Sequence, residues 1–349
     1  VALGGHPAEV YDNTKMWRAE KAAFGGEDPG FEKFDYPPTF LLMVLPLSLI
    51  PYNWSLLIWT VLGLSLYLSV LYKTAGDRDA VWAGLIFPGA LLTLIAGQNG
   101  FITTALLGGG LLLLESRPWA AGACFGLLCY KPQFGILLPL VLIAGLRGRA
   151  FAGATLAVVA CVAVSVAFFG VETWREFLAS VPDTTHNILE HGDIGFSKMQ
   201  SVFSGVRMWG TPVGVSYAIQ LMLSVVSGAA VVWIWSKPVR FPLKASALVV
   251  GTLLAIPYLV DYDLVLLSIP LAWLAVDAMN GSFLPWEKSL LALAWVFPLF
   301  ARLIATEASL PLAPVVLVAM MIAIGRRVLA GPVGGLSHDS QLGAPAVRL

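Results

Sequence analysis

The stretch GQNGFITTALLGGGLLLLESRPWAAGACFGLLCYKPQFGILLPL, residues 97–140, decides the fold. It contains two apolar segments joined by a short charged connector, 115–118, and it is bordered by two small polar groups, 97–100 and 130–133. An amide or an ammonium group in hydrocarbon is costly unless it faces protein, water or a ligand. The sequence therefore predicts membrane-spanning helices here, and the two polar groups are the first candidates for a functional site.

The composition of the whole chain indicates a polytopic membrane protein. Of the 349 residues, 58% are hydrophobic and 12% are charged, and the mean hydropathy is +0.81. A soluble domain is usually about 25% charged. The formal net charge is zero, which argues against nucleic acid as a partner. Cys124, Cys129 and Cys161 lie in apolar runs without metal-ligand spacing, so we expect ordinary buried cysteines.

The predicted fold class is all-α, a polytopic transmembrane helical bundle of about eleven spans. Segment 39–50 contains Pro46 and is too short to cross alone, because about 20 residues are needed, so it is predicted as a re-entrant or interfacial helix. Several spans beside the polar groups have only about 12 to 17 apolar residues, which leaves the polar groups recessed below the membrane surface. The candidate spans are 53–72, 80–96, 101–114, 119–130, 134–146, 150–169, 212–235, 245–257, 264–276, 289–300 and 312–324.

The distribution of basic residues gives the orientation. If residues 1–36 lie outside, alternation of the spans leaves only Lys131 and Arg302 in the short outer connections, as the excess of basic residues in cytoplasmic loops requires. We expect an external region at 1–37, a transmembrane domain at 38–326 with an external loop at 170–211, and a disordered cytoplasmic tail at 327–349. The basic residues that fall on the cytoplasmic side are Lys73, Arg78, Arg117, Arg147, Arg149, Lys237, Arg240, Lys244, Lys288, Arg326, Arg327 and Arg348.

The polar residues of the two groups allow a structural and a functional interpretation. Lys131 either snorkels to the headgroup layer or, in a recessed pocket, binds a lipid-linked phosphate through charge and hydrogen bonds. Gln98 and Asn99 either close a turn between two glycines or offer their amides to sugar hydroxyls or to the phosphate.

Further polar residues fall on the same side of the membrane. Asp261 and Asp263 form either a solvated turn or a sugar-binding or metal-binding pair, although two carboxylates alone are a weak metal signal. In loop 170–211, His186 and His191 have no metal-ligand spacing, so no metal site is expected. The polar residues of this loop are expected to be solvated. Two acids of the first region, Asp12 and Asp35, could act as a general base only if they folded into the pocket.

These motifs together resemble glycosyltransferase family 87, which are integral membrane, mannosyltransferase-like proteins of the GT-C superfamily. The resemblance covers nearly the whole chain. Its most specific features are the Gly-Gln-Asn and Lys-Pro-Gln motifs, which lie at a characteristic separation along the sequence. The motifs, in order, are Tyr36-Pro37-Pro38, Gly97-Gln98-Asn99-Gly100, Tyr130-Lys131-Pro132-Gln133, Met199-Gln200-Ser201 and Asp261-Tyr262-Asp263.

The resemblance implies a glycosyltransferase of the bacterial cytoplasmic membrane with an external active face. It would move a hexose, expected to be mannose, from a polyprenyl-phosphate donor to a lipid or glycan acceptor, with inversion and without a cofactor or metal. The expected donor-binding residues are Lys131, Gln98, Asn99, Gln133 and Tyr36. Contacts to the acceptor or sugar are expected from Gln200, Arg207, Asp261 and Asp263.

The family's catalytic aspartate follows an N-terminal membrane helix. Residues 3–12 of this sequence resemble the segment that comes after that aspartate. We therefore expect the helix and the catalytic aspartate upstream of Val1, and no residue of the printed sequence is assigned as the base.

Two other classes of protein are alternatives. A transporter or lipid flippase would also need many spans and a polar cavity, but its polar segments usually lie near the middle of the bilayer and its halves are often repeated. No internal repeat is evident here, and the polar groups cluster toward one face. A non-catalytic membrane scaffold is the third class, and it would bind a donor without turnover.

Overall fold

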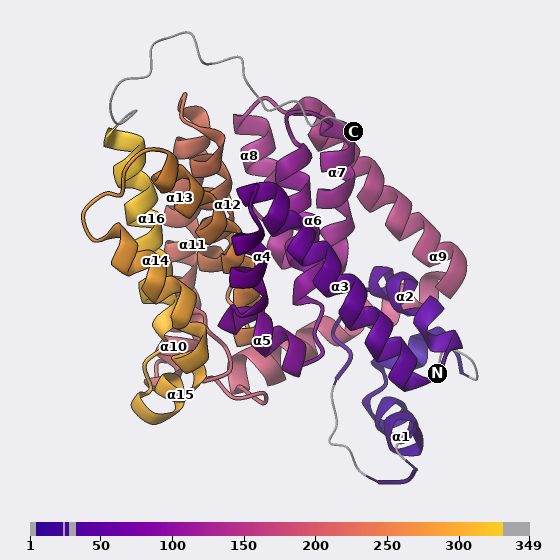
Figure 1. The fold of residues 1–349 in the computed structure, drawn as a ribbon. Helices are drawn as coiled ribbons and strands as arrows, with labels where there is room; N and C mark the ends of the chain where they lie inside the picture. The colour runs from indigo at the N-terminus through magenta and orange to yellow at the C-terminus, as the bar shows by residue number, and fades with distance from the viewer. Residues whose placement is uncertain (1–4, 24, 28–32, 331–349) are drawn as a thin grey trace.

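The computed structural model describes residues 5–23, 25–27 and 33–330 (Figure 1). These residues form sixteen α-helices, and the β-structure among them is one isolated bridge between Met199 and Val260. The predicted all-α class is confirmed. The helices are α1 Asn13–Ala23, α2 Pro38–Val44, α3 Tyr52–Ala75, α4 Arg78–Leu85, α5 Pro88–Ile95, α6 Gly100–Leu113, α7 Pro118–Leu127, α8 Leu138–Ala144, α9 Gly148–Thr184, α10 Val202–Met208, α11 Val213–Ser236, α12 Phe241–Ala255, α13 Ser268–Asn280, α14 Glu287–Val296, α15 Pro298–Ala308 and α16 Leu312–Ala330.

Shorter helical turns connect these elements. The 3₁₀ turns are η1 Pro7–Tyr11, η2 Pro46–Leu49, η3 Leu128–Tyr130, η4 Pro132–Gly135 and η6 Asp261–Leu267, and η5 Thr185–His191 is a π-helix. Proline occupies the first helical positions of α2, α5, α7 and α15, where its missing N–H has no helical partner to lose. The helix boundaries beside the polar groups therefore follow from proline positions in the sequence.

The apolar helices fall into three groups by their length and by whether they are bent. Five helical runs are long and apolar enough to cross, and two bent pairs raise the number to seven if each pair is one span. The bent pairs are α4 with α5, at 52°, and α14 with α15, at 75°. Four shorter apolar helices, Gly100–Leu113, Pro118–Tyr130, Pro132–Ala144 and Phe241–Ala255, complete the set. Each of the eleven predicted segments is thus helical, and those beside the polar groups are short, as expected.

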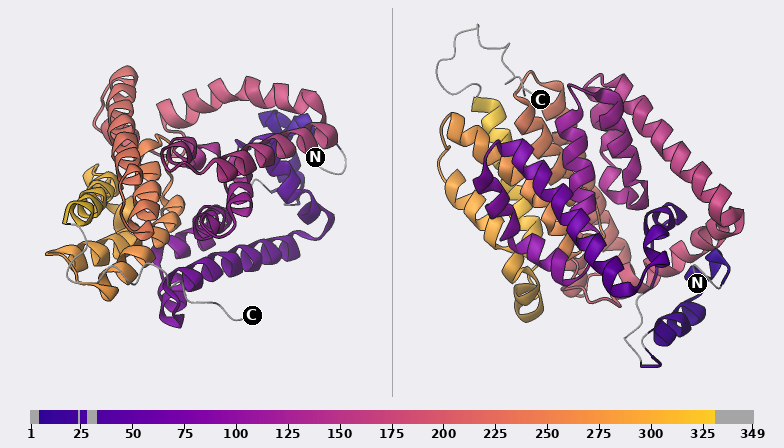
Figure 2. Two further views of the ribbon diagram at one scale, coloured as in Figure 1. Left: turned by 90° about the horizontal axis from the view of Figure 1, so that it is seen from above. Right: turned by 45° about the vertical axis from the view of Figure 1, so that its right-hand side comes forward.

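Helix α12 forms the centre of the bundle. Its residues from Ala245 to Ala255 are all buried, and it packs against α11, α13 and α16. Helix α9 lies instead along the outside of the molecule (Figure 2). The arrangement places a helix that is apolar all round inside the bundle, as its uniform hydrophobicity requires.

The segment predicted as an external loop, 170–211, is largely helical. Helix α9 continues to Thr184 past a break at Gly170, whose φ of 79° and ψ of 161° are not helical, and η5 and α10 follow. Glycine adopts this positive φ without the penalty of a side chain. The polar residues beyond Gly170 led to the prediction of a loop, whereas they are part of a helix that changes direction.

The predicted tail boundary at residue 327 also differs from the structure. Helix α16 continues to Ala330, and Arg327 is buried in it. Arg327 is held there by ion pairs with Glu287 and Asp277. The rest of the predicted tail, 331–349, lies outside the described residues.

Candidate functional site

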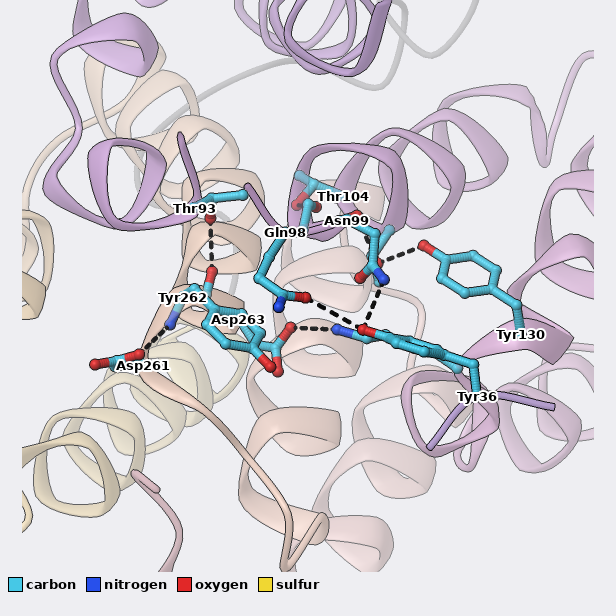
Figure 3. A network of polar contacts seen from close by, with 12 residues as sticks. Tyr36, Thr93, Gln98, Asn99, Thr104, Tyr130, Asp261, Tyr262 and Asp263 are labelled. Atoms are coloured by element: carbon cyan, nitrogen blue, oxygen red, sulfur yellow. Dashed lines mark hydrogen bonds and ion pairs between the residues drawn. The ribbon is translucent and has the colours of Figure 1, made fainter. Parts of the chain in front are cut away.

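Three connections and one short helix bring the polar residues together at one end of the bundle. Tyr36 lies two residues before α2, Gln98 and Asn99 connect α5 to α6, and Asp263 is in η6 (Figure 3). Lys131 lies between η3 and η4. In Figure 1 the meeting point of α5 and α6 is at the lower end, opposite the last turn of α16. The two polar groups singled out from the sequence therefore meet in space.

Close packing of two glycines on η6 makes this meeting possible. A Cβ on Gly89 would lie 3.0 Å from the backbone N of Val265, and a Cβ on Gly100 would lie 2.8 Å from Cγ1 of Val265. Real Cβ atoms do not approach this closely without a shift of their neighbours. The absence of side chains at these two positions thus lets α5 and α6 lie directly on the helix that carries Asp263.

A buried ion pair forms the centre of the site. Nζ of Lys131 lies 2.9 Å from Oδ1 of Asp263, and the two residues are 4% and 1% exposed. Three rings surround the ammonium, with centroids 5.9 Å (Tyr36), 5.6 Å (Phe134) and 5.3 Å (Tyr262) from Nζ. Aromatic faces attract a cation but accept no full hydrogen bond from it. The ammonium therefore keeps hydrogen-bonding capacity beyond its bond to Asp263. Of the two interpretations of Lys131, its burial disagrees with the one in which it snorkels to the headgroup layer.

A second network joins the amides of the first polar group to Tyr36. Nδ2 of Asn99 donates to the Tyr36 hydroxyl at 2.8 Å, and that hydroxyl donates to Oε1 of Gln98 at 3.2 Å. Burial raises the pKa of Tyr36, and the nearby charge of Lys131 opposes this shift. The hydroxyl therefore stays protonated and available as a donor. Oδ1 of Asn99 is buried and has no partner among the described residues, which leaves one acceptor for a ligand hydroxyl.

The Asp-Tyr-Asp segment binds two cations and is not a solvated turn. Asp261, at 1% exposed, forms an ion pair with Arg302 of α15, whose Nε lies 2.5 Å from Oδ2. The carbonyl of Tyr262 accepts a hydrogen bond from Thr93 at 2.7 Å. Together with the pairing of Asp263, this means that each of the two acids holds one of the two basic residues that the sequence predicts for the short outer connections.

Gln200 approaches the same segment through its backbone. Its N–H donates to the carbonyl of Leu259 at 2.6 Å, beside the isolated bridge between Met199 and Val260. The side chain is fully buried, and its Oε1 has no partner within the part of the chain that the structure describes. Gln200 therefore lies next to the Asp-Tyr-Asp segment and offers a second unpaired amide oxygen.

Other predicted residues lie apart from this network. Gln133 is half-buried in η4, with no side-chain hydrogen bond to the described residues. Arg207 donates to the carbonyls of Thr211 and Glu190, at 2.6 and 2.8 Å, so it fixes the fold of its own segment. Asp12 caps the start of α1, and Asp35 accepts a hydrogen bond from Thr184.

Sequence reasoning missed several aromatic residues of the site. The Tyr130 hydroxyl lies 2.6 Å from Oγ1 of Thr103. Phe40 stacks between Tyr36 and Tyr130, with centroid distances of 4.3 and 5.5 Å. Tyr36 was predicted, whereas Phe40 and Tyr130 were not, because aromatic residues in an apolar chain are ordinarily assigned to the core. The only signal for Tyr130 was its place in the Tyr-Lys-Pro-Gln motif.

The fold and the site define a polytopic, all-α membrane protein with a buried cation beside unpaired amide oxygens. Residues 34–257 match the sequence model described as glycosyltransferase family 87. The match covers more than half of the chain and includes Tyr36, Gln98, Asn99 and Lys131. The chain therefore belongs to glycosyltransferase family 87, and it is a membrane glycosyltransferase. Neither a curated protein nor a solved structure matches it.

Proposed function

We propose that this glycosyltransferase moves a hexose, mannose in the first instance, from a polyprenyl-phosphate donor to a lipid or glycan acceptor. The observation that carries the proposal is the Lys131 ammonium, which is buried and retains hydrogen-bonding capacity. A donor phosphate binds such a group by charge attraction and hydrogen bonding in a medium of reduced dielectric. A water-soluble nucleotide donor has no need of a cation placed among apolar helices, whereas a lipid-linked donor does.

The chemistry assigned to each group follows from its position. The acceptor hydroxyl oxygen forms a bond to the anomeric carbon as the bond from that carbon to the phosphate oxygen breaks. Lys131 stabilises the negative charge that develops on the departing phosphate. Asn99 Oδ1 accepts a hydrogen bond from a hydroxyl of the sugar, and Gln98 and Tyr36 hold Asn99 in place.

The proton of the acceptor hydroxyl goes to a general base. We assign this role to neither Asp261 nor Asp263, because each is held in an ion pair with a basic residue. These acids instead act as counter-ions. This replaces the sequence-based hypothesis that they contact sugar.

The proposed location is the bacterial cytoplasmic membrane, with the active site at the external face. The supporting observation is that Tyr36, the two polar groups and the Asp-Tyr-Asp segment gather at one end of the helices. A transporter would need polar groups near the middle of the bilayer. The one-sided placement therefore favours transfer of the sugar over its transport.

The test is incorporation of radiolabelled sugar by the purified protein in lipid vesicles. Polyprenyl-phosphate-mannose, polyprenyl-phosphate-glucose and a mannose nucleotide are compared as donors. We expect a new glycosidic product from polyprenyl-phosphate-mannose and none from the nucleotide. Movement of intact donor across the bilayer without a new product would instead identify a flippase, and donor binding without turnover would identify a scaffold.

A further inference from the structure

A pocket lies at the end of the bundle opposite the candidate site. Its volume is about 460 Å³, and it is open to the outside. The connection between α13 and α14 and the first turn of α14 form its walls, which are Phe283, Leu284, Pro285, Trp286, Lys288 and Ser289. The pocket is therefore aromatic and apolar inside and carries a cation.

Two basic side chains at this pocket have no carboxylate partner among the described residues. Lys288 is exposed, and its Nζ lies 4.8 Å from the ring centroid of Phe283. Arg326 of α16 is exposed and donates to the carbonyl of Pro285 at 3.3 Å. The neighbouring acids, Asp277 and Glu287, are buried in ion pairs. The pocket thus carries two uncompensated positive charges.

An apolar stripe on α16 runs from the position of Arg326. Val315, Val318 and Ile322 are 60%, 37% and 59% exposed, and Leu329 is 76% exposed. With Arg326 these positions follow spacings of three and four residues, so they share one face of the helix. This face presents hydrocarbon surface along its length and a cation near one end.

Trp286 marks the same end as a membrane interface. Its side chain is 84% exposed, and its φ of 70° is unusual for a bulky residue. Such backbone conformations persist where the surroundings hold them, often at ligand sites. Tryptophan is enriched at the boundary between hydrocarbon and headgroups. An exposed tryptophan at the mouth of the pocket therefore fits a position at headgroup depth.

We propose that this pocket binds the headgroup of an anionic phospholipid. The phosphate lies between Lys288 and Arg326, and an acyl chain follows the exposed face of α16 past Ile322. Charge complementarity selects this occupant, because a zwitterionic headgroup brings a cation that two uncompensated positive charges repel. The site is separate from the glycosyl-transfer chemistry and does not depend on the donor assignment.

The test is binding of phosphatidylglycerol and phosphatidylcholine to the purified full chain in detergent, measured by native mass spectrometry. We expect the parent to prefer phosphatidylglycerol, and the variant Lys288→Gln with Arg326→Gln to bind it about tenfold more weakly. The matched control, Lys73→Gln with Arg117→Gln, removes the same charge from exposed positions elsewhere and should bind as the parent does. Absence of a preference in the parent, or an equal loss in the control, overturns the proposal.

A second variant tests the acyl-chain path. Ile322→Asn should weaken binding of dioleoyl phosphatidylglycerol and leave dihexanoyl phosphatidylglycerol unaffected, because only the long chain reaches this position. Thermal unfolding of each variant shows whether the fold is retained. Equal effects on both chain lengths would overturn the path along α16.

Discussion

Two buried ion clusters lie at opposite ends of one helical run, η6 followed by α13, and they differ in how fully their polar atoms are paired. At one end the guanidinium of Arg327 binds both oxygens of Glu287, one oxygen of Asp277 and the carbonyl of Ser282. Arg240 binds the other oxygen of Asp277. At this end the fork geometry of arginine is matched by two carboxylates and one backbone carbonyl.

The cluster at the other end is incomplete. Lys131 has one carboxylate contact and three ring contacts, and the nearby Asn99 has an unpaired oxygen. A buried polar group without a partner lowers stability unless something else binds it. The difference teaches that burial of charge alone does not identify a site. A ligand-binding cluster is distinguished from a structural one by buried polar atoms that still have unused hydrogen-bonding capacity.

The largest effect is expected from a substitution that breaks the complete cluster around Arg327. Arg327→Met leaves the buried Glu287 carboxylate without its cation and Asp277 with Arg240 alone, and it should destabilise the protein by about 3–5 kcal/mol. Removing the acids too, in a variant with Glu287→Leu and Asp277→Leu, should recover most of that loss. Denaturant unfolding in detergent measures both. Transfer activity per folded molecule should stay at the parental value, and a specific loss of activity would contradict a structural role.

The next largest effect is expected when the ion pair of the incomplete cluster, Lys131 with Asp263, is removed. Lys131→Met with Asp263→Leu eliminates the whole ion pair, which is often neutral for stability. Loss of the group that stabilises the departing phosphate should lower transfer about 10²–10³-fold. The control, Arg147→Met with Glu115→Leu, removes an exposed ion pair and should keep its activity. Full activity in the Lys131 double variant would show that this lysine has no part in transfer.

A smaller effect distinguishes a counter-ion from a sugar contact at Asp263. Asp263→Asn keeps a hydrogen-bond acceptor for Lys131 but removes the compensating charge. Attraction of the donor phosphate to the ammonium should then strengthen, so the KM for the donor should fall about tenfold. Initial rates over a range of donor concentrations give this value. An increase in KM would restore the hypothesis that Asp263 contacts the sugar.

The smallest effect concerns the amide network. Tyr36→Phe removes the hydroxyl that joins Gln98 to Asn99, and one such hydrogen bond contributes about 1 kcal/mol. The KM for the donor should rise about fivefold while kcat stays nearly constant, because the amides orient the substrate and take no proton. A large fall in kcat with an unchanged KM would assign Tyr36 a role in the chemical step.

The helices and the end of the bundle that carries the site could be predicted from the sequence. Apolar runs interrupted by proline give the short helices, and polar residues beside them stand out because lipid penalises them. The pairing of Lys131 with Asp263 could not be predicted, because 132 residues separate them. Their contact depends on Gly89 and Gly100, whose small size matters only once α5, α6 and η6 are placed against one another.

Local sequence misled at two places for physical reasons. Two acids around a tyrosine are typical of a solvated turn, yet Asp261 and Asp263 are buried because cations from distant helices pair with them. The charged residues after Gly170 are typical of a loop, yet they continue as a helix that contacts the N-terminal segment. In both cases a tertiary contact outweighed a local preference.

The backbone bridge between Met199 and Val260 has a consequence for which substitutions the site tolerates. The bridge and the bond from Gln200 N–H to the carbonyl of Leu259 use main-chain atoms alone. A change of side chain at Met199 or Gln200 therefore removes none of the bonds that hold this segment against the Asp-Tyr-Asp segment.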